Sequence, residues 1–186
     1  MSNLPPDRMI RTDLLFPLQV PPLKSFHEEA RFFGATRHDS HRNVRLHAAV
    51  DLLGTIGTKV YAMADGITGE FAPSFYTKKD QAVAILHGNM TVRYCEIKVH
   101  PKFQYAGVMV KAGEEIGAIS VLAESNSSML HLEMYDTITP YHLTVYPPAG
   151  GQFRRAGTLV NPTSMVEQAA RNSCISLPPP AAKQRK

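Results

Sequence analysis

The chain has 186 residues, 44% hydrophobic and 19% charged, which excludes disorder over most of its length and fits one well-buried domain. Its net charge of +4 would suit an anionic cell wall. A single-stranded nucleic-acid partner is excluded because there is no tryptophan and no interleaving of aromatic and basic residues. The two cysteines, Cys95 and Cys174, exclude a disulfide framework and a cysteine-based zinc site.

The first two thirds of the chain predict mainly strands. Prolines break residues 1–25, which are expected to form an extended lead-in that packs along the domain. Two early glutamates and a late arginine favour a short helix over residues 26–33. Hairpin turns are predicted at Asp65-Gly66 and at His87-Gly88-Asn89. Segments rich in Val, Ile, Leu, Tyr and Thr predict strands at residues 44–53, 58–64, 67–73, 81–87, 90–97 and 129–135.

The last third adds a turn and a helix. Residues 108–119 bend around Ala112-Gly113 and predict a further turn between strands. Asn161 is a candidate N-cap, with Pro162 in the first position of a short terminal helix. Residues 172–186 are basic and proline-rich and are expected to be disordered. Together these elements predict an all-β sandwich or open barrel with short N- and C-terminal helices, formed by residues 26–171 as one domain.

Membrane and secretion signals are not found in the sequence. No apolar run approaches the roughly 20 residues that a membrane-spanning helix needs. The apolar run at residues 14–16 is followed at once by proline and is too short for the apolar region of a secretory signal. We therefore expect a chain without a membrane span that is made in the cytoplasm without a signal peptide.

Two short phrases carry candidate metal ligands. His47 and Asp51 are four residues apart, so in an extended chain their side chains share one face. His131 lies on a predicted strand whose opposite face is apolar, with Glu133 on its own face as a structural partner or acceptor for a histidine N–H. Two histidines and one aspartate fit a three-ligand catalytic zinc site with an open fourth position. The alternative for Asp51 is that it caps a turn, and His27, His100 and His142 are expected to be inert.

Six short sequence segments, in their residues and in their order, resemble the lysostaphin/LytM-type zinc metallopeptidases over roughly residues 31–167. The matching phrases are HAAVDL (47–52), GTKVYAMADGITG (57–69), AILHGNMTVRYCEI (84–97), VKAGEEIGAI (110–119), MLHLEMY (129–135) and LVNPT (159–163). The resemblance implies an antiparallel β-fold with a groove. It also implies one zinc ion held by His47, Asp51 and His131, and hydrolysis of peptide bonds in peptidoglycan.

The sequence departs from the family pattern at two catalytic places. Family members usually carry Y-x-H where this chain has Tyr94-Cys95-Glu96, and H-x-H where this chain has Met129-Leu130-His131. Methionine can neither donate a hydrogen bond nor hold a proton, so one donor is lost. A carboxylate beside a catalytic zinc is a competent general base, which makes Glu96 the candidate catalytic residue.

Several roles stay open at this point. Glu96 is a general base, a solvated edge residue or a fourth zinc ligand that would close the site. The missing donor could come from Arg37, His38 or His41, which precede the first ligand. Tyr94 faces either the core or the groove, and Arg37 and Tyr94 are candidates for binding substrate.

The leading hypothesis is a zinc-dependent endopeptidase that cuts peptidoglycan stem peptides or cross-links, of the DD-endopeptidase type. The alternative is a catalytically degenerate module that binds peptidoglycan or activates another wall hydrolase, and a third class is a structural part of a phage or secretion machine. Since the inferred substrate lies outside the cytoplasm, we expect delivery to the periplasm by a type VI secretion apparatus, as an antibacterial effector, or by a phage. An immunity or delivery protein is then a further expected partner.

Overall fold

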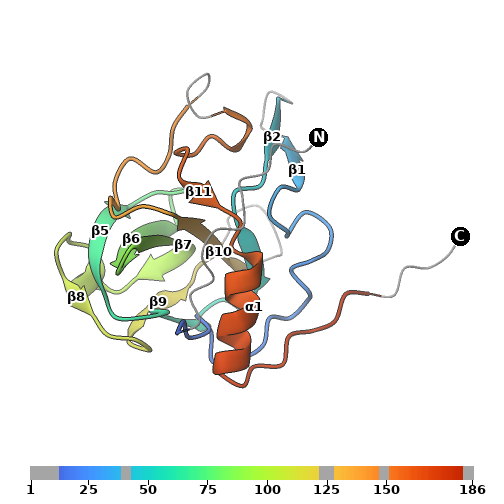
Figure 1. Cartoon of the computed structure of the whole chain (residues 1–186), viewed down its shortest axis with the longest axis horizontal. Coiled ribbons are helices and arrows are strands. Elements are labelled where there is room, and N and C mark those ends of the chain that lie inside the picture. Colours follow the sequence, from blue (N-terminus) through green and yellow to red (C-terminus); the bar gives the residue numbers. More distant parts are fainter. Residues whose placement is uncertain (1–12, 39–42, 122–127, 147–150, 182–186) are drawn as a thin grey trace, which may run out of the picture.

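The computed structural model describes residues 13–38, 43–121, 128–146 and 151–181. Among these residues nine strands form one antiparallel sheet, two short strands form a second sheet, and one α-helix lies near the C-terminus (Figure 1). The elements are β1 (Thr36–His38), β2 (Val44–Leu46), β3 (Val50–Leu53), β4 (Lys59–Tyr61), β5 (Gly66–Ala72), β6 (Gln81–His87), β7 (Met90–Val99), the 3-10 helix η1 (Pro101–Phe103), β8 (Met109–Val110), β9 (Glu115–Ile119), β10 (Met129–Tyr135), the 3-10 helix η2 (Gly151–Phe153), β11 (Leu159–Val160) and α1 (Thr163–Asn172). The predicted all-β antiparallel fold with a short C-terminal helix is confirmed.

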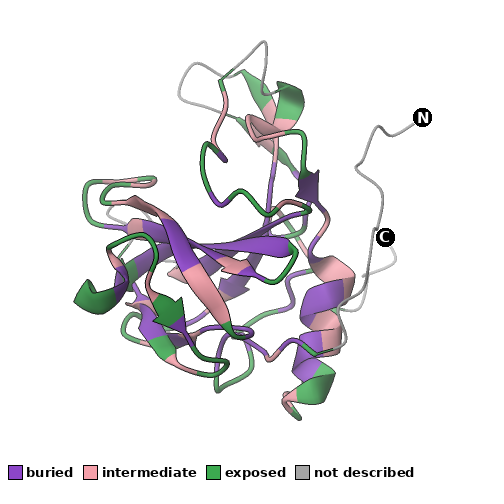
Figure 2. Ribbon diagram, turned by 60° about the vertical axis from the view of Figure 1, so that its left-hand side comes forward, coloured by how far each residue is buried: buried purple, intermediate pink, exposed green. Residues whose placement is uncertain are grey.

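The large sheet is built on the long strand β7. Its order is β11-β10-β7-β6-β5-β8, and β3 also pairs with β10, so that two strands share one edge of β10. The end of β7 pairs with β9, which in turn pairs with β4. The central strands are buried, whereas the β1–β2 hairpin is largely exposed (Figure 2).

The hairpin between β6 and β7 forms as predicted. His87 pairs with Met90, and Gly88 adopts a φ of 67°, a backbone conformation that costs glycine little. No hairpin forms at Asp65-Gly66, because β4 pairs with β9 and not with β5. The Asp65 carboxylate instead accepts hydrogen bonds from Ala112 N and Lys111 Nζ, so that prediction was wrong.

A β-bulge interrupts β7 at Glu96. Gln81 pairs with Ile97 and Ala82 with Cys95, so Glu96 is an extra residue without a partner on β6, and its φ is 63°. The side chains that enter the main core change from Val92 and Tyr94 before the bulge to Ile97 and Val99 after it. Glu96 therefore leaves the core face of the strand and joins Cys95 on the opposite face.

The lead-in packs along the domain in its described part. Leu14, Phe16 and Leu18 are buried in the main core. Phe16 N donates to Ser173 Oγ at the end of α1, over 2.8 Å. The segment thus joins the sheet to the terminal helix.

Of the two predicted helices, the C-terminal one is present and the N-terminal one is not. The predicted C-terminal helix α1 begins at Thr163, so its N-cap position is Pro162 and the predicted N-cap at Asn161 lies one residue too early. The Asn161 side-chain oxygen still accepts a hydrogen bond from Thr163 N over 3.0 Å. The short helix expected at residues 26–33 was wrong, because this segment forms turns in which Glu29 has a φ of 53°. The Arg31 guanidinium bonds both Glu28 and Glu29 and stabilises these turns.

Four further segments pair as strands: β1, β8, β9 and β11. The chain between β8 and β9 turns at Ala112-Gly113, as the sequence predicts. Beyond α1, Ile175 and Leu177 pack against the main core. How far the tail at residues 172–186 is disordered stays a prediction. None of the described helices is long and apolar enough to cross a membrane.

Candidate metal centre

Backbone pairing brings the three predicted metal ligands together. Asp51 of β3 and His131 of β10 are direct cross-strand partners. His47 lies in the break between β2 and β3, where its backbone N–H and carbonyl bond Ala35 and Gly34, over 2.8 Å each. The three side chains converge, although His47 is not on the same extended strand as Asp51.

The ligand atoms form a small buried triangle. His47 Nε2 lies 3.0 Å and His131 Nδ1 lies 2.9 Å from Asp51 Oδ1, and the two ring nitrogens are 3.2 Å apart. The exposed fractions of His47, Asp51 and His131 are only 1%, 1% and 7%. The alternative that Asp51 caps a turn is not what the structure shows.

Hydrogen bonds outside the triangle fix which ring nitrogen carries the proton. His47 Nδ1 lies 2.9 Å from the carbonyl of Phe32, and His131 Nε2 lies 3.1 Å from Glu133 Oε1. Since both outer partners are acceptors, the neutral rings must donate outward and direct a lone pair into the triangle. Two nitrogen lone pairs and a carboxylate oxygen then face one another, an arrangement that a metal ion or a proton between them would stabilise.

The geometry fits zinc. With bonds of about 2.0 to 2.1 Å, tetrahedral zinc places its ligand atoms about 3.3 Å apart, close to the edges of this triangle. Arg37 holds Asp51 Oδ2 over 2.6 Å, which leaves Oδ1 as the metal ligand. Two imidazoles and one carboxylate also match zinc better than magnesium or calcium.

The pKa values describe the same centre without a cation. Burial would raise the pKa of Asp51, but hydrogen bonds with His131 and His47 hold it well below its usual range. Burial lowers the pKa of His47. Burial also opposes the charged form of His131, yet hydrogen bonds with Asp51 and Glu133 raise its pKa to about 9. A proton on His131 therefore competes with a metal ion for this site.

Glu133 holds His131 from behind. Its carboxylate also accepts from Tyr135 Oη over 2.5 Å and from Arg155 Nε over 2.7 Å, and Arg93 lies 3.7 Å away. Although burial raises the pKa of Glu133, the charge of Arg155 and the bond to His131 keep it well below the usual range. The predicted role as acceptor of a histidine N–H is confirmed.

The other predicted site residues have different surroundings. Glu96 is 8% exposed, lies on the metal side of the sheet through its bulge, and interacts electrostatically with His131 and Asp51. Its Oε2 is buried without a hydrogen-bond partner among the described residues. Burial raises the pKa of Glu96 to about 7. It does not belong to the group of possible metal ligands, which contains His47, Asp51 and His131.

Tyr94 and the loop histidines stand apart from the ligands. Tyr94 is fully buried in the main core, where its hydroxyl accepts from Met63 N and bonds His87 Nε2. It therefore offers no surface to a substrate, and the proposed binding role is corrected. His38 is exposed, and alternation along β1 turns it away from the face on which Arg37 reaches Asp51. His41 lies outside the described residues.

The comparisons with known proteins agree with this geometry. The model of peptidase family M23 matches residues 45–161. The chain belongs to peptidase family M23. Among curated proteins, no sequence match is found.

Three solved structures are similar to this M23 chain, and the first two have TM-scores above 0.5, which shows a shared fold. LytU is 16% identical with a TM-score of 0.53, and 92% of this chain and 97% of that chain are covered. The lysostaphin catalytic domain from Staphylococcus simulans is 19% identical with a TM-score of 0.52, covering 73% and 89%. Helicobacter pylori Csd3 is 20% identical with a TM-score of 0.49, covering 87% of this chain but 41% of that one. The chain thus spans less than half the length of Csd3.

Family membership and the ligand set together define the chemistry. The chain is an M23 metallopeptidase whose zinc ligands are His47 Nε2, Asp51 Oδ1 and His131 Nδ1. The predicted cofactor, zinc, is confirmed by this assignment.

The loop between β5 and β6 contributes a side chain that sequence reasoning missed. The Phe75 ring lies 5.9 Å from the His131 ring, and the Arg93 guanidinium lies over it at 4.8 Å. The buried carboxylate of Asp80 fixes the loop by accepting from Tyr76 N and Thr77 N, over 2.8 Å each. The only sequence signal was an aspartate following a short polar turn.

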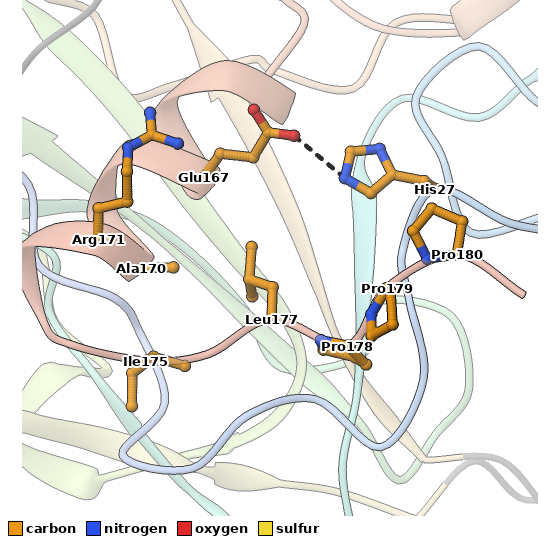
Figure 3. Close-up of a pocket in the computed structure, with 9 residues that line it drawn as sticks. All are labelled: His27, Glu167, Ala170, Arg171, Ile175, Leu177, Pro178, Pro179 and Pro180. Carbon is orange, nitrogen blue, oxygen red and sulfur yellow. Dashed lines mark ion pairs between the residues drawn. The ribbon is translucent and has the colours of Figure 1, made fainter.

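A separate hollow of this M23 domain lies between α1 and the C-terminal segment (Figure 3). It is lined by Leu177, Pro178 to Pro180 and one face of α1, and it contains an ion pair of 3.1 Å between His27 and Glu167. None of the zinc ligands lines it. The hollow is therefore not part of the catalytic centre.

Replacing Glu133 by glutamine should weaken zinc binding about 10- to 100-fold while leaving all three ligands in place. The substitution removes the acceptor charge that orients His131 and leaves Arg155 and Arg93 without their shared anion, so the free energy of unfolding should also fall. Zinc affinity is measured by competition with a chelator of known strength. Tyr135→Phe is the matched control, because it removes one hydrogen bond to Glu133 and keeps the charge. Equal zinc affinity in Glu133→Gln and the unmodified protein would contradict this role.

Proposed function

We propose that this M23 metallopeptidase hydrolyses peptide bonds in peptidoglycan stem peptides or cross-links, as an endopeptidase of the DD type. The observation that carries the proposal is a buried three-ligand zinc centre with Glu96 on the same side of the sheet, whose carboxylate oxygen Oε2 is buried without a hydrogen-bond partner among the described residues. The lysostaphin catalytic domain, which shares the fold, is an antimicrobial peptidase. The resemblance of the six sequence phrases to lysostaphin/LytM-type enzymes supports the same substrate.

Zinc, when bound, supplies Lewis-acid activation of water and of the scissile carbonyl. The remaining steps fall to the residues of this chain. Glu96 Oε2 has no hydrogen-bond partner among the described residues, so it is available to accept a proton from the attacking water and to return it to the leaving amine. Burial raises its pKa to about 7 without metal, and a bound zinc ion would lower this pKa, so that the carboxylate is ionised and able to accept the proton near neutral pH.

This site differs from the family pattern in how charge on the substrate oxygen is stabilised. Met129 stands where a histidine is usual and offers no donor. Arg37 is the candidate replacement, because its NH2 group is fixed on Asp51 and its buried Nε–H has no partner among the described residues. Glu96 and Arg37 thus take over the two functions of the missing histidines in this proposal.

The decisive experiment is digestion of purified cross-linked muropeptides, followed by mass analysis of the products. We expect cleavage that stops when a chelator removes the metal and returns when zinc is added back. Binding to peptidoglycan without cleavage under all these conditions would overturn the proposal in favour of a degenerate binding or activating module.

Delivery to the periplasm by a contractile secretion apparatus or during phage lysis or entry remains a proposal from the sequence. If the target is the wall, expression in bacteria should be toxic when a signal peptide directs the chain to the periplasm. Cytoplasmic expression at the same level should be harmless. His131→Ala is the inactive control, and equal toxicity in both compartments would contradict a wall target.

A further inference from the structure

Two arginines face each other on the hairpin that borders the metal centre. Arg37 of β1 and Arg45 of β2 are direct cross-strand partners, so their side chains lie on the same face. Arg37 reaches Asp51, a metal ligand, over 2.6 Å. Arg45 therefore lies beside the arginine that bonds a zinc ligand.

A third arginine, Arg155, lies within electrostatic reach of Arg45. The strand β2 is in contact with η2, and Arg155 follows η2 in the chain. Burial and the neighbouring guanidinium groups of Arg155 and Arg37 lower the pKa of Arg45. The exposed Tyr76, on the loop that carries Phe75, is also within electrostatic reach of Arg45.

Among the described residues, two of these three arginines have a carboxylate that neutralises them. Asp51 holds Arg37 and Glu133 holds Arg155. In the described part of the chain, no carboxylate contacts the half-buried Arg45. Like charges directly opposite each other on a hairpin are destabilising, so the fold maintains an unneutralised cation beside the site at a cost in stability.

We propose that Arg45 forms a subsite that binds a free carboxylate of the peptide substrate close to the bond that is cleaved. A planar guanidinium matches a carboxylate with two parallel hydrogen bonds, which fixes the orientation of the substrate as well as its charge. The inference rests on the proposed function and narrows it. The enzyme selects stem peptides that carry an ionised carboxyl group next to the scissile bond over neutral bridges.

The experiment compares two forms of one substrate. Cross-linked muropeptide dimers are used as purified and after conversion of their carboxyl groups to carboxamides, and kcat/KM is measured for each. The unmodified protein should prefer the free-acid dimers by about 10- to 100-fold, the range expected for a hydrogen bond to a charged group. Arg45→Gln should reduce that preference to within about 2-fold, mainly by losing activity on the free acid.

Two further variants make the result specific. Arg45→Lys keeps the charge without the planar fork and should retain part of the preference. Arg171→Gln removes the same charge from an exposed position on α1, where the guanidinium donates to Gln168, and should retain all of the preference. Since Arg45→Gln relieves repulsion, its thermal stability should equal or exceed that of the unmodified protein.

The outcomes separate this inference from the proposed function. Cleavage of neither form by any variant would refute the hydrolase itself. Equal cleavage of both forms by the unmodified protein, or an unchanged preference in Arg45→Gln, would refute the subsite and leave the hydrolase intact.

Discussion

His131→Ala and His47→Ala should each abolish stoichiometric zinc binding and, with it, peptide cleavage. Each substitution removes one of only three ligands, which is a greater loss than the about 10- to 100-fold caused by removing a ligand's hydrogen-bond partner. Metal analysis of dialysed protein should give one zinc per chain for the unmodified protein and close to none for the variants.

His100→Ala is the matched control, because His100 is exposed and its side chain contacts Lys102 N and the Phe103 ring. It should keep full zinc content. A second measurement covers the risk that the variants fold poorly: added zinc should raise the melting temperature of the unmodified protein and of His100→Ala only. Full zinc occupancy in His131→Ala would disprove the assignment.

Glu96→Gln should reduce turnover by about 100-fold or more and leave zinc bound. Glutamine keeps the size and polarity of the side chain, but it removes the group that accepts the proton. Both zinc content and muropeptide cleavage are measured on the same preparation. Weaker zinc binding with retained or higher activity would identify Glu96 as a fourth ligand instead.

Glu115→Gln is the control for this variant, since Glu115 is exposed and pairs with Lys59 at the surface. Its turnover should be unchanged. The unmodified enzyme should also lose activity as the pH falls, with an acidic limb no higher than about pH 7, because zinc lowers the pKa of a neighbouring carboxylate from the value of about 7 found without metal.

The same carboxylate makes the stability of the metal-free protein depend on pH. Burial raises the pKa of Glu96 from 4.5 to about 7, so the folded state binds this proton more tightly than the unfolded state. The stabilisation is complete below about pH 4.5 and is lost as the pH rises through about 7, with a total of about 3 kcal/mol. Chemical denaturation should show this loss in the metal-free unmodified protein and not in Glu96→Gln.

The parts of the fold that could be predicted from the sequence are those with strong local patterns. The strand at 81–87 and the strand at 129–135 were predicted with the bounds that the structure has. The strands β1, β8 and β11 have only two or three residues, too few to show an alternation. The expected helix at residues 26–33 failed because charge order alone cannot show the left-handed backbone of Glu29.

The candidate site also shows that only features with a local sequence pattern could be predicted. All three ligands were predicted, because spacing and phrase order are visible in the sequence. Regular alternation along β7 would put Glu96 on the same face as Tyr94. The alternation breaks at the bulge, so Tyr94 turned out to be in the core while Glu96 lies on the metal side. The contacts of Arg45 and Phe75 could not be predicted, since they depend on long-range packing.

The left-handed backbone at position 96 sets stability against the proposed catalytic role of Glu96. A non-glycine residue with a φ of 63° is strained by about 1 to 3 kcal/mol, and its buried carboxylate oxygen adds a further penalty. Glycine would occupy the same backbone without strain. Laboratory evolution that selects only for thermal stability should therefore enrich Glu96→Gly early. The selected variants should have a higher melting temperature and no longer hydrolyse the substrate.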